Sequence, residues 1–238
     1  MPNKKNILVV NGYSYGKAVW GLGQQHRTVS EFFKDPKSFD LILFTGGEDV
    51  DPYFYGDTSP KGYCGSSISR DFYEKKIFDV AVANGILMAG ICRGLQFINC
   101  MAGGKMLHHI NSHAGRNHNM VTSMHGELVV NSYHHQMILP PPSAKVIGWA
   151  ARNLSDIYIG AEDEDVEYCG KEIEAAIFPD CRGFGVQYHP EALSDKSDGY
   201  DYFYMMVKTA MYTKWEQFIK EYYKEDNEVI PHNNFAAG

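Results

Sequence analysis

Three uninterrupted apolar runs in the first part of the chain restrict its fold more than any other feature. They are residues 6–10 (NILVV), 40–44 (DLILF) and 86–90 (ILMAG). Runs of this length without polar alternation are typical of parallel strands that helices cover on both faces. Between the second and third runs, residues 70–84 carry apolar side chains at steps of three and four and end in an Asn-Gly stop signal. The alternation predicts βαβ units and an α/β fold.

The second half of the chain is rich in short strand-like segments separated by turn residues. They are residues 127–132, 144–150, 156–161, 173–178 and 183–189. We expect these segments to extend the same sheet.

The last part of the chain has a helical period. From residue 200 to about residue 224, apolar side chains recur at the spacing of an amphipathic helix, which predicts one closing helix packed on the sheet. The tail, residues 233–238, is expected to fray. With 238 residues and no internal repeat or linker, we expect one domain that covers residues 1–238.

The composition excludes several classes of function. A net charge of -7 without a basic stripe argues against a nucleic-acid partner, because such binding relies on lysine and arginine that displace counterions. The apolar run near the N-terminus is too short for a signal peptide, and no run approaches the roughly 18 residues that a membrane helix needs. The five cysteines form no C-x-x-C pair, which predicts reduced thiols in the cytoplasm.

Cys92 stands between two glycines in the segment MAGICRGLQFIN, residues 88–99. The order of residues predicts an apolar strand, a tight turn at the cysteine and a helix that begins directly after it, which is the arrangement of a nucleophile elbow. The flanking glycines allow strand and helix to approach closely, and the N-terminus of the helix favours a thiolate and a developing oxyanion. The alternative is a buried structural cysteine that happens to precede a helix.

A histidine and a carboxylate follow a later strand in GVQYHPE, residues 185–191. In extended backbone His189 and Glu191 project to the same side, and the proline between them fixes φ. Glu191 can therefore accept the ring N–H of His189 and stabilise the imidazolium, as in a catalytic base with its orienting acid. The alternative is a solvated pair at a strand end.

A glycine pair follows another apolar strand in FTGGEDVDPYFYGD, residues 44–57. Gly46 and Gly47 permit a tight turn whose backbone N–H groups are free to donate to an oxyanion. The acidic residues after them either face an amine on the substrate or form a solvated loop.

Taken together, these segments resemble the class I glutamine amidotransferase superfamily, and within it the γ-glutamyl hydrolase branch known as peptidase C26. The resemblance is carried by TGGEDVDPYFYG (45–56), by residues 70–99 with the elbow, by VNSYHHQ (130–136) and by GVQYHPE (185–191). It implies a three-layer sandwich with a central, mostly parallel sheet, of the flavodoxin-like type. It also implies hydrolysis of a small γ-glutamyl amide without a cofactor or a metal.

The resemblance implies a role for each site residue. Cys92 would be the nucleophile, His189 the general base and then acid, and Glu191 the orienting residue of a Cys-His-Glu triad that forms a γ-glutamyl thioester. Six further residues would bind the oxyanion or the substrate, namely Gly46, Gly47, Arg93, Gln96, His134 and His135.

Two other functions stay open at this point. The same triad could serve a glutaminase subunit that delivers ammonia from glutamine to a synthetase partner. The compact Gly-Gly-Pro-Gly turn of such subunits is replaced here by Gly-Gly-Glu-Asp, which favours the stand-alone hydrolase.

The third function is a metal-binding or noncatalytic module built on histidines. Seven histidines fall within residues 108–135, namely His108, His109, His113, His118, His125, His134 and His135. Imidazole is a common zinc ligand, but no H-E-x-x-H or paired Cys/His spacing is present, so the sequence favours the enzyme.

Overall fold

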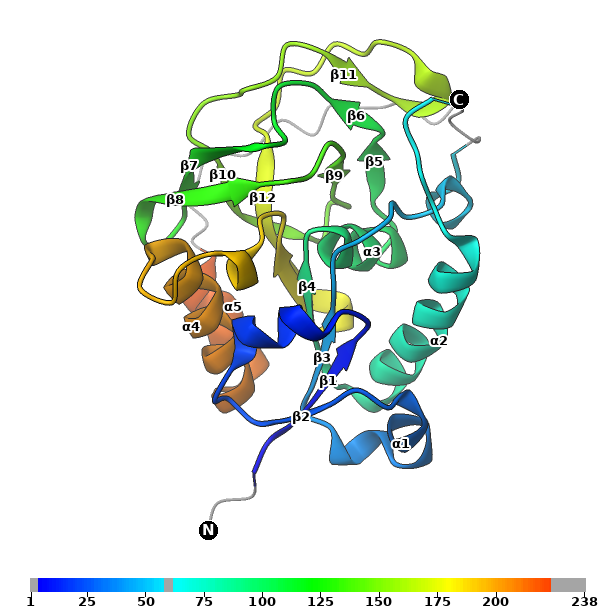
Figure 1. Ribbon diagram of the computed structural model, residues 1–238, viewed down its shortest axis with the longest axis vertical. Coiled ribbons are helices and arrows are strands. Elements are labelled where there is room, and N and C mark those ends of the chain that lie inside the picture. Colours follow the sequence, from blue (N-terminus) through cyan, green and yellow to red (C-terminus); the bar gives the residue numbers. More distant parts are fainter. Residues whose placement is uncertain (1–3, 58–61, 224–238) are drawn as a thin grey trace.

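The apolar runs of the sequence form the middle of one central sheet. The computed structural model describes residues 4–57 and 62–223. Nine strands pair in the order β2-β1-β3-β4-β13-β12-β10-β7-β8 (Figure 1). Their bounds are β1 Asn6–Val10, β2 Gln24–His26, β3 Leu41–Phe44, β4 Leu87–Ile91, β7 Arg116–Thr122, β8 Gly126–Ser132, β10 Lys145–Ala150, β12 Ile173–Phe178 and β13 Gly183–Val186. The five strands from β2 to β13 pair in parallel, and the four from β12 to β8 join them antiparallel.

Helices cover this sheet on both faces and make three layers (Figure 1). The helices are α1 Val29–Lys34, α2 Ile68–Asn84, α3 Arg93–Met101, α4 Asp198–Tyr212 and α5 Trp215–Tyr222. Alternate side chains of each central strand enter separate cores, as the period of a strand requires. Leu8 of β1 packs in the core with α1, α2 and α3, whereas Ile7 packs in the core with α4 and α5. This explains why the central runs are apolar at nearly every position.

Two small two-stranded sheets lie beyond the central sheet. One pairs β5 (Lys105–Leu107) with β9 (Met137–Leu139), and the other pairs β6 (His109–Ile110) with β11 (Tyr158–Ile159). Short 3-10 helices complete the fold: η1 Tyr13–Val19, η2 Pro36–Ser38, η3 Pro52–Tyr55, η4 Ala161–Asp163, η5 Pro179–Cys181 and η6 Pro190–Ala192.

The predicted α/β fold with a central, mostly parallel sheet is confirmed, and some boundaries are corrected. The segment 156–161 contributes only β11, which lies outside the central sheet. The expected closing helix is two helices, because Thr213 and Lys214 adopt extended backbone between α4 and α5. The break lets the Trp215 indole donate to the carbonyl of Pro179 at 3.2 Å. The expected tail, residues 233–238, lies outside the described residues.

The helices can also be tested against the thickness of a bilayer. Within residues 4–57 and 62–223, no helix is both long and apolar enough to cross a membrane.

Candidate active site

Cys92 occupies the corner between β4 and α3. Its backbone has φ 52° and ψ -113°, a conformation that non-glycine residues rarely adopt and that stores strain. The Cys92 N–H donates to the carbonyl of Val186 on the neighbouring strand at 2.8 Å, which holds the corner in place. The side chain is thereby presented at the N-terminus of α3, as the sequence predicted for an elbow.

Glycines allow the elbow to form because backbone segments meet there. A Cβ on Gly94 would lie 2.6 Å from the carbonyl carbon of Phe44 and closer still to its oxygen. A Cβ on Gly90 would lie 2.5 Å from the carbonyl carbon of Gly94. Only glycine permits α3 to approach β3 and β4 at this distance.

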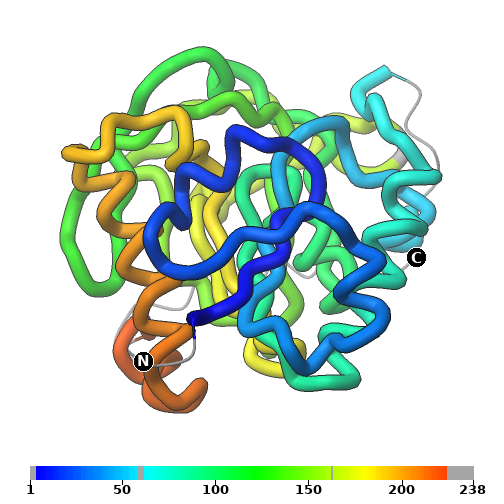
Figure 2. Tube along the Cα trace, turned by 60° about the horizontal axis from the view of Figure 1, so that its bottom comes forward, coloured from blue at the N-terminus to red at the C-terminus, as the bar shows by residue number. Residues whose placement is uncertain are grey.

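His189 follows β13 and is fixed by a side chain from another strand. Its N–H donates to Oδ1 of Asn131 at 2.8 Å, and Nδ2 of Asn131 donates to its carbonyl at 3.0 Å. The rings of Tyr15 and Tyr133 lie 5.9 Å and 5.3 Å from the imidazole, centroid to centroid. Tyr15 comes from η1, which lies beside η6 although about 175 residues separate them in the chain (Figure 2).

The electrostatics of the site favour an imidazolium. Nδ1 of His189 lies 2.7 Å from Oε1 of Glu191, which leaves Nε2 for Cys92. Burial alone would lower the pKa of His189, but hydrogen bonds to Cys92 and Glu191 and their negative charges raise it to about 10. Burial, helped by the charges of Glu191 and Cys92, raises the pKa of Tyr15 to about 12, so its hydroxyl stays protonated. At neutral pH the site therefore holds an imidazolium beside Cys92 and a protonated Tyr15 hydroxyl.

The Gly46-Gly47 loop contacts the same histidine. A Cβ on Gly46 would lie 3.1 Å from Cε1 of His189, and Gly47 has a φ of 137° that favours glycine. Nη2 of Arg70 donates to the carbonyls of Thr45 at 3.2 Å and Gly46 at 3.0 Å. Because the peptide between Gly46 and Gly47 is trans, a carbonyl held by Arg70 directs the Gly47 N–H to the opposite side.

A buried ion-pair network stands behind the elbow. The Arg93 guanidinium, 1 % exposed, pairs with the carboxylates of Asp71 and Glu74 on α2. Glu74 also pairs with Arg70 at 2.9 Å and accepts a hydrogen bond from Asn11 at 2.8 Å. The network therefore couples α3, α2 and the glycine loop. The backbone N–H of Arg93, the first residue of α3, has no acceptor within the helix.

The remaining predicted residues lie in different surroundings. Gln96 is buried on α3 and its Nε2 donates to the carbonyl of Gln136 at 3.4 Å. His135 is half-exposed, with Nε2 3.3 Å from Oδ1 of Asp49 in the loop after Gly47. His134 is fully buried and points toward Glu174.

The acidic residues Asp49 and Asp51 of the loop accept hydrogen bonds from different groups. Asp49 accepts the Gly65 N–H at 2.8 Å, and Asp51 accepts the N–H of Tyr53 at 3.0 Å and the hydroxyl of Ser66 at 2.7 Å. These two carboxylates therefore shape the loop.

The sequence did not predict the residues that hold Cys92, His189 and Glu191 in place. Arg70 and Glu74 had a signal, since an acid four residues after a base on one helix face is a pairing pattern. Asn131 lay inside the quoted segment 130–136, but its contact with His189 depends on tertiary structure. Tyr15 gave no signal that we recognise.

Comparison with known proteins identifies the family. Residues 25–191, more than half of the chain, match the family model described as Peptidase C26. The chain belongs to the peptidase C26 family. The matched region contains the glycine loop, the elbow and the His189–Glu191 pair, and the chain is accordingly glutamine amidotransferase-like.

Curated relatives and solved structures agree with this assignment. PB2B2.05 of Schizosaccharomyces pombe, whose name marks it as a candidate glutamine amidotransferase, is 28% identical over 173 residues, covering 68% of this chain and 65% of that protein. Rv2859c of Mycobacterium tuberculosis, named in the same way, is 28% identical over 177 residues, covering 68% of this chain and 57% of that protein. The chain thus spans less than two thirds of the length of these two relatives.

The solved structures share the fold. A candidate GMP synthase subunit from Thermoplasma acidophilum superposes with a TM-score of 0.59 at 14% identity, covering 93% of this chain and 100% of that one. PurLQS from Thermotoga maritima gives a TM-score of 0.56 at 15% identity, covering 89% and 100%. The fold is therefore the α/β fold of class I glutamine amidotransferase structures, with a central mixed, mostly parallel sheet.

Proposed function

We propose that this chain hydrolyses the γ-glutamyl amide bond of a small γ-glutamyl amine. The observation that carries the proposal is the meeting of three groups at one corner of the sheet. Cys92 stands on a strained elbow, and His189 beside it is hydrogen-bonded to Glu191 at 2.7 Å. A thiolate, an imidazolium and an orienting carboxylate are the parts of covalent acyl transfer.

The proposed reaction has two halves. The thiolate of Cys92 attacks the γ-carbonyl carbon and forms a C–S bond, and the N–H groups of Gly47 and Arg93 stabilise the oxyanion. The C–N bond then breaks as the His189 imidazolium gives its Nε2 proton to the departing amine. The neutral imidazole next takes a proton from water, whose oxygen attacks the γ-glutamyl thioester. Breaking the C–S bond releases glutamate and restores the thiolate and the imidazolium.

The loop after Gly47 favours a stand-alone hydrolase. It is an extended acidic segment tied to His135 and to Gly65 through Asp49, whereas ammonia-delivering glutaminases carry a compact turn at this place.

A second candidate, a glutaminase subunit with a synthetase partner, is favoured by the glutamine amidotransferase names of the relatives. Glutamate release from glutamine and from γ-glutamyl amines, with and without candidate partners, separates the two. Release from glutamine that needs a partner supports the second candidate.

Covalent trapping tests the nucleophile. The chain is incubated with a glutamine analogue that carries an electrophilic carbon in place of the γ-amide, and peptides are analysed by mass spectrometry. We expect one adduct, on Cys92, that disappears in Cys92→Ala and forms more slowly in His189→Asn. Cys100→Ala, on the same helix, is the matched control and should label normally. An adduct on another cysteine with Cys92 unmodified would refute the assignment.

A further inference from the structure

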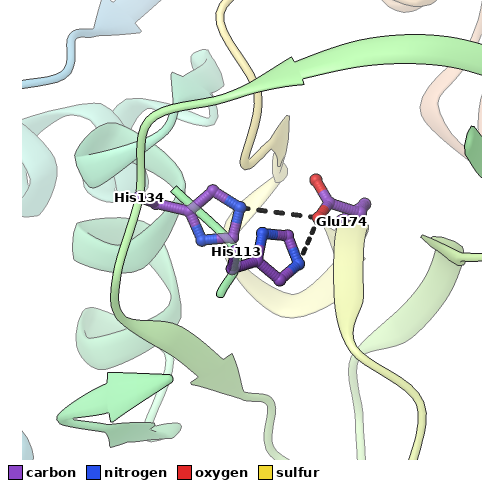
Figure 3. A group of neighbouring side chains, drawn as sticks. All are labelled: His113, His134 and Glu174. Atoms are coloured by element: carbon purple, nitrogen blue, oxygen red, sulfur yellow. Dashed lines mark ion pairs between the residues drawn. The ribbon is translucent and has the colours of Figure 1, made fainter. Parts of the chain in front are cut away.

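A second polar cluster lies inside the molecule and has no part in the proposed reaction. It consists of His113 in the segment between β6 and β7, His134 two residues after the end of β8, and Glu174 on β12 (Figure 3). Each side chain is 1 % exposed or less. One atom from each, an imidazole nitrogen or a carboxylate oxygen, lies within 4.8 Å of the other two.

The atoms that face one another are unsatisfied. Nε2 of His113, Nε2 of His134 and both oxygens of Glu174 make no hydrogen bond of normal geometry within the described part of the chain. Buried polar atoms are rarely left in this state, because each costs about 1–3 kcal/mol. The carboxylate of Glu174 and the two imidazole nitrogens face one another without hydrogen bonds of normal geometry. Such an arrangement is suited to binding a cation.

The outer nitrogens of both imidazoles are anchored. Nδ1 of His113 lies 2.9 Å from Oγ of Ser132, and Nδ1 of His134 lies 2.9 Å from the carbonyl of Gln136. A histidine that donates its Nδ1–H to a carbonyl presents a lone pair on Nε2, and metal ligands are held in this way.

The spacing of the inner atoms matches a tetrahedral ion. Oε1 of Glu174 is 3.3 Å from Nε2 of His113 and 3.4 Å from Nε2 of His134. Zinc bonds of about 2.0–2.1 Å to nitrogen and oxygen separate neighbouring ligand atoms in a tetrahedron by about 3.3–3.4 Å. Nε2 of His118, on β7, lies 3.1 Å from the same oxygen, but His118 is not in the group whose ligand atoms all lie within 4.8 Å of one another.

The charge of the cluster also favours a dication. Glu172, fully buried, has Oε2 at 3.4 Å from Nε2 of His113, so two carboxylates share the interior with three imidazoles. Glu172 already accepts the backbone N–H groups of Leu154 and Ser155, whereas neither oxygen of Glu174 makes a hydrogen bond of normal geometry with the described residues. A divalent ion would offset the buried charge of Glu174, since uncompensated ions are costly to bury.

We propose that this cluster is a buried site for a zinc-type divalent ion, ligated by His113, His134 and Glu174. The ion would join β12 to the segments around β7 and β8, which carry Asn131 and so hold His189 in place. The proposal does not depend on the proposed function. The sequence offered His113 and His134 among its candidate metal-binding histidines but gave no sign of Glu174, which lies 40 residues after His134 and at no motif spacing from it.

Metal binding is tested on the full chain carrying Cys92→Ala, so that the active thiolate holds no zinc. The protein is stripped with a chelator, equilibrated with Zn²⁺ or Co²⁺, and desalted. We expect about one equivalent of zinc per chain, a visible Co²⁺ absorption of the tetrahedral type, and a melting temperature higher by roughly 5 °C or more with zinc. Glu174→Gln and His134→Ala should each lower zinc affinity at least about tenfold.

The matched control is His108→Gln. His108 is also fully buried and pairs with a carboxylate, Asp57 at 3.2 Å, but lies outside the cluster, so this variant should keep one equivalent. A folded Cys92→Ala chain that retains less than about a tenth of an equivalent and does not change its melting temperature would overturn the proposal. Unchanged binding in a folded Glu174→Gln chain would also overturn it.

Discussion

Gly94→Ala tests whether close packing of α3 sets the position of the nucleophile. The new Cβ would meet the carbonyl carbon of Phe44 at 2.6 Å, whereas ordinary contact begins near 3.4 Å. Helix and strand must therefore separate by roughly 0.8 Å or more. Overpacking of this kind costs about 1–3 kcal/mol, and a displacement near 1 Å at a reacting group lowers the rate by on the order of 100-fold.

The assay combines thermal unfolding with kcat/KM on a γ-glutamyl amide. We expect the melting temperature to fall by roughly 2–4 °C for each kcal/mol lost, and kcat to fall more than KM rises. Gly65→Ala is the matched control, because a Cβ there meets only Asp49 Oδ2 at 4.0 Å. A Gly94→Ala chain with the activity and melting temperature of the parent would refute the packing argument.

Three further predictions concern the charges around the site. In Glu191→Gln the pKa of His189, held at about 10, should fall because the orienting carboxylate is lost. The imidazolium then loses its proton at lower pH, so the alkaline decline of kcat/KM should move to a pH roughly 1–3 units lower. An unchanged pH profile would contradict this. Arg93→Met leaves its two carboxylate partners short of a counter-ion and should cost about 3–5 kcal/mol in urea unfolding, whereas a neutral result would show that Arg70 alone neutralises them. Arg70→Met releases the Gly46 carbonyl and should lower kcat by on the order of 100-fold with little change in KM. Arg70→Lys should recover part of the lost kcat, and Lys75→Met, on the same helix, should leave kcat unchanged.

Much of the fold was predictable because burial and sequence pattern coincide in its centre. The runs at residues 6–10 and 173–178 match β1 and β12 at both ends, since these strands are covered on both faces. β7, Arg116–Thr122, was missed because one of its inward positions carries His118, a polar residue where the pattern requires an apolar one. The end of α4 was missed because Thr213 stops the helix without a glycine or proline.

The candidate site divides in the same way. The elbow and the His-Pro-Glu ending are local arrangements, so the sequence predicts their geometry, and their catalytic roles stay predictions. The clamp of Arg70 on the Gly46 carbonyl and the anchoring of His189 by Asn131 join distant segments. No spacing along the chain encodes such contacts. The same holds for the buried cluster, since the sequence offered His113 and His134 as possible ligands but did not place Glu174 beside them.

The place of β13 in the sheet has a consequence for how the molecule is assembled. It is the last strand in the described part of the chain, yet it lies fifth of nine, between β4 and β12. Until it inserts, the parallel and antiparallel halves have no shared edge, and the sulfur at the end of β4 has no imidazole beside it. A ribosome that has not yet released about residue 191 thus carries a divided sheet and a Cys92 without its partner histidine.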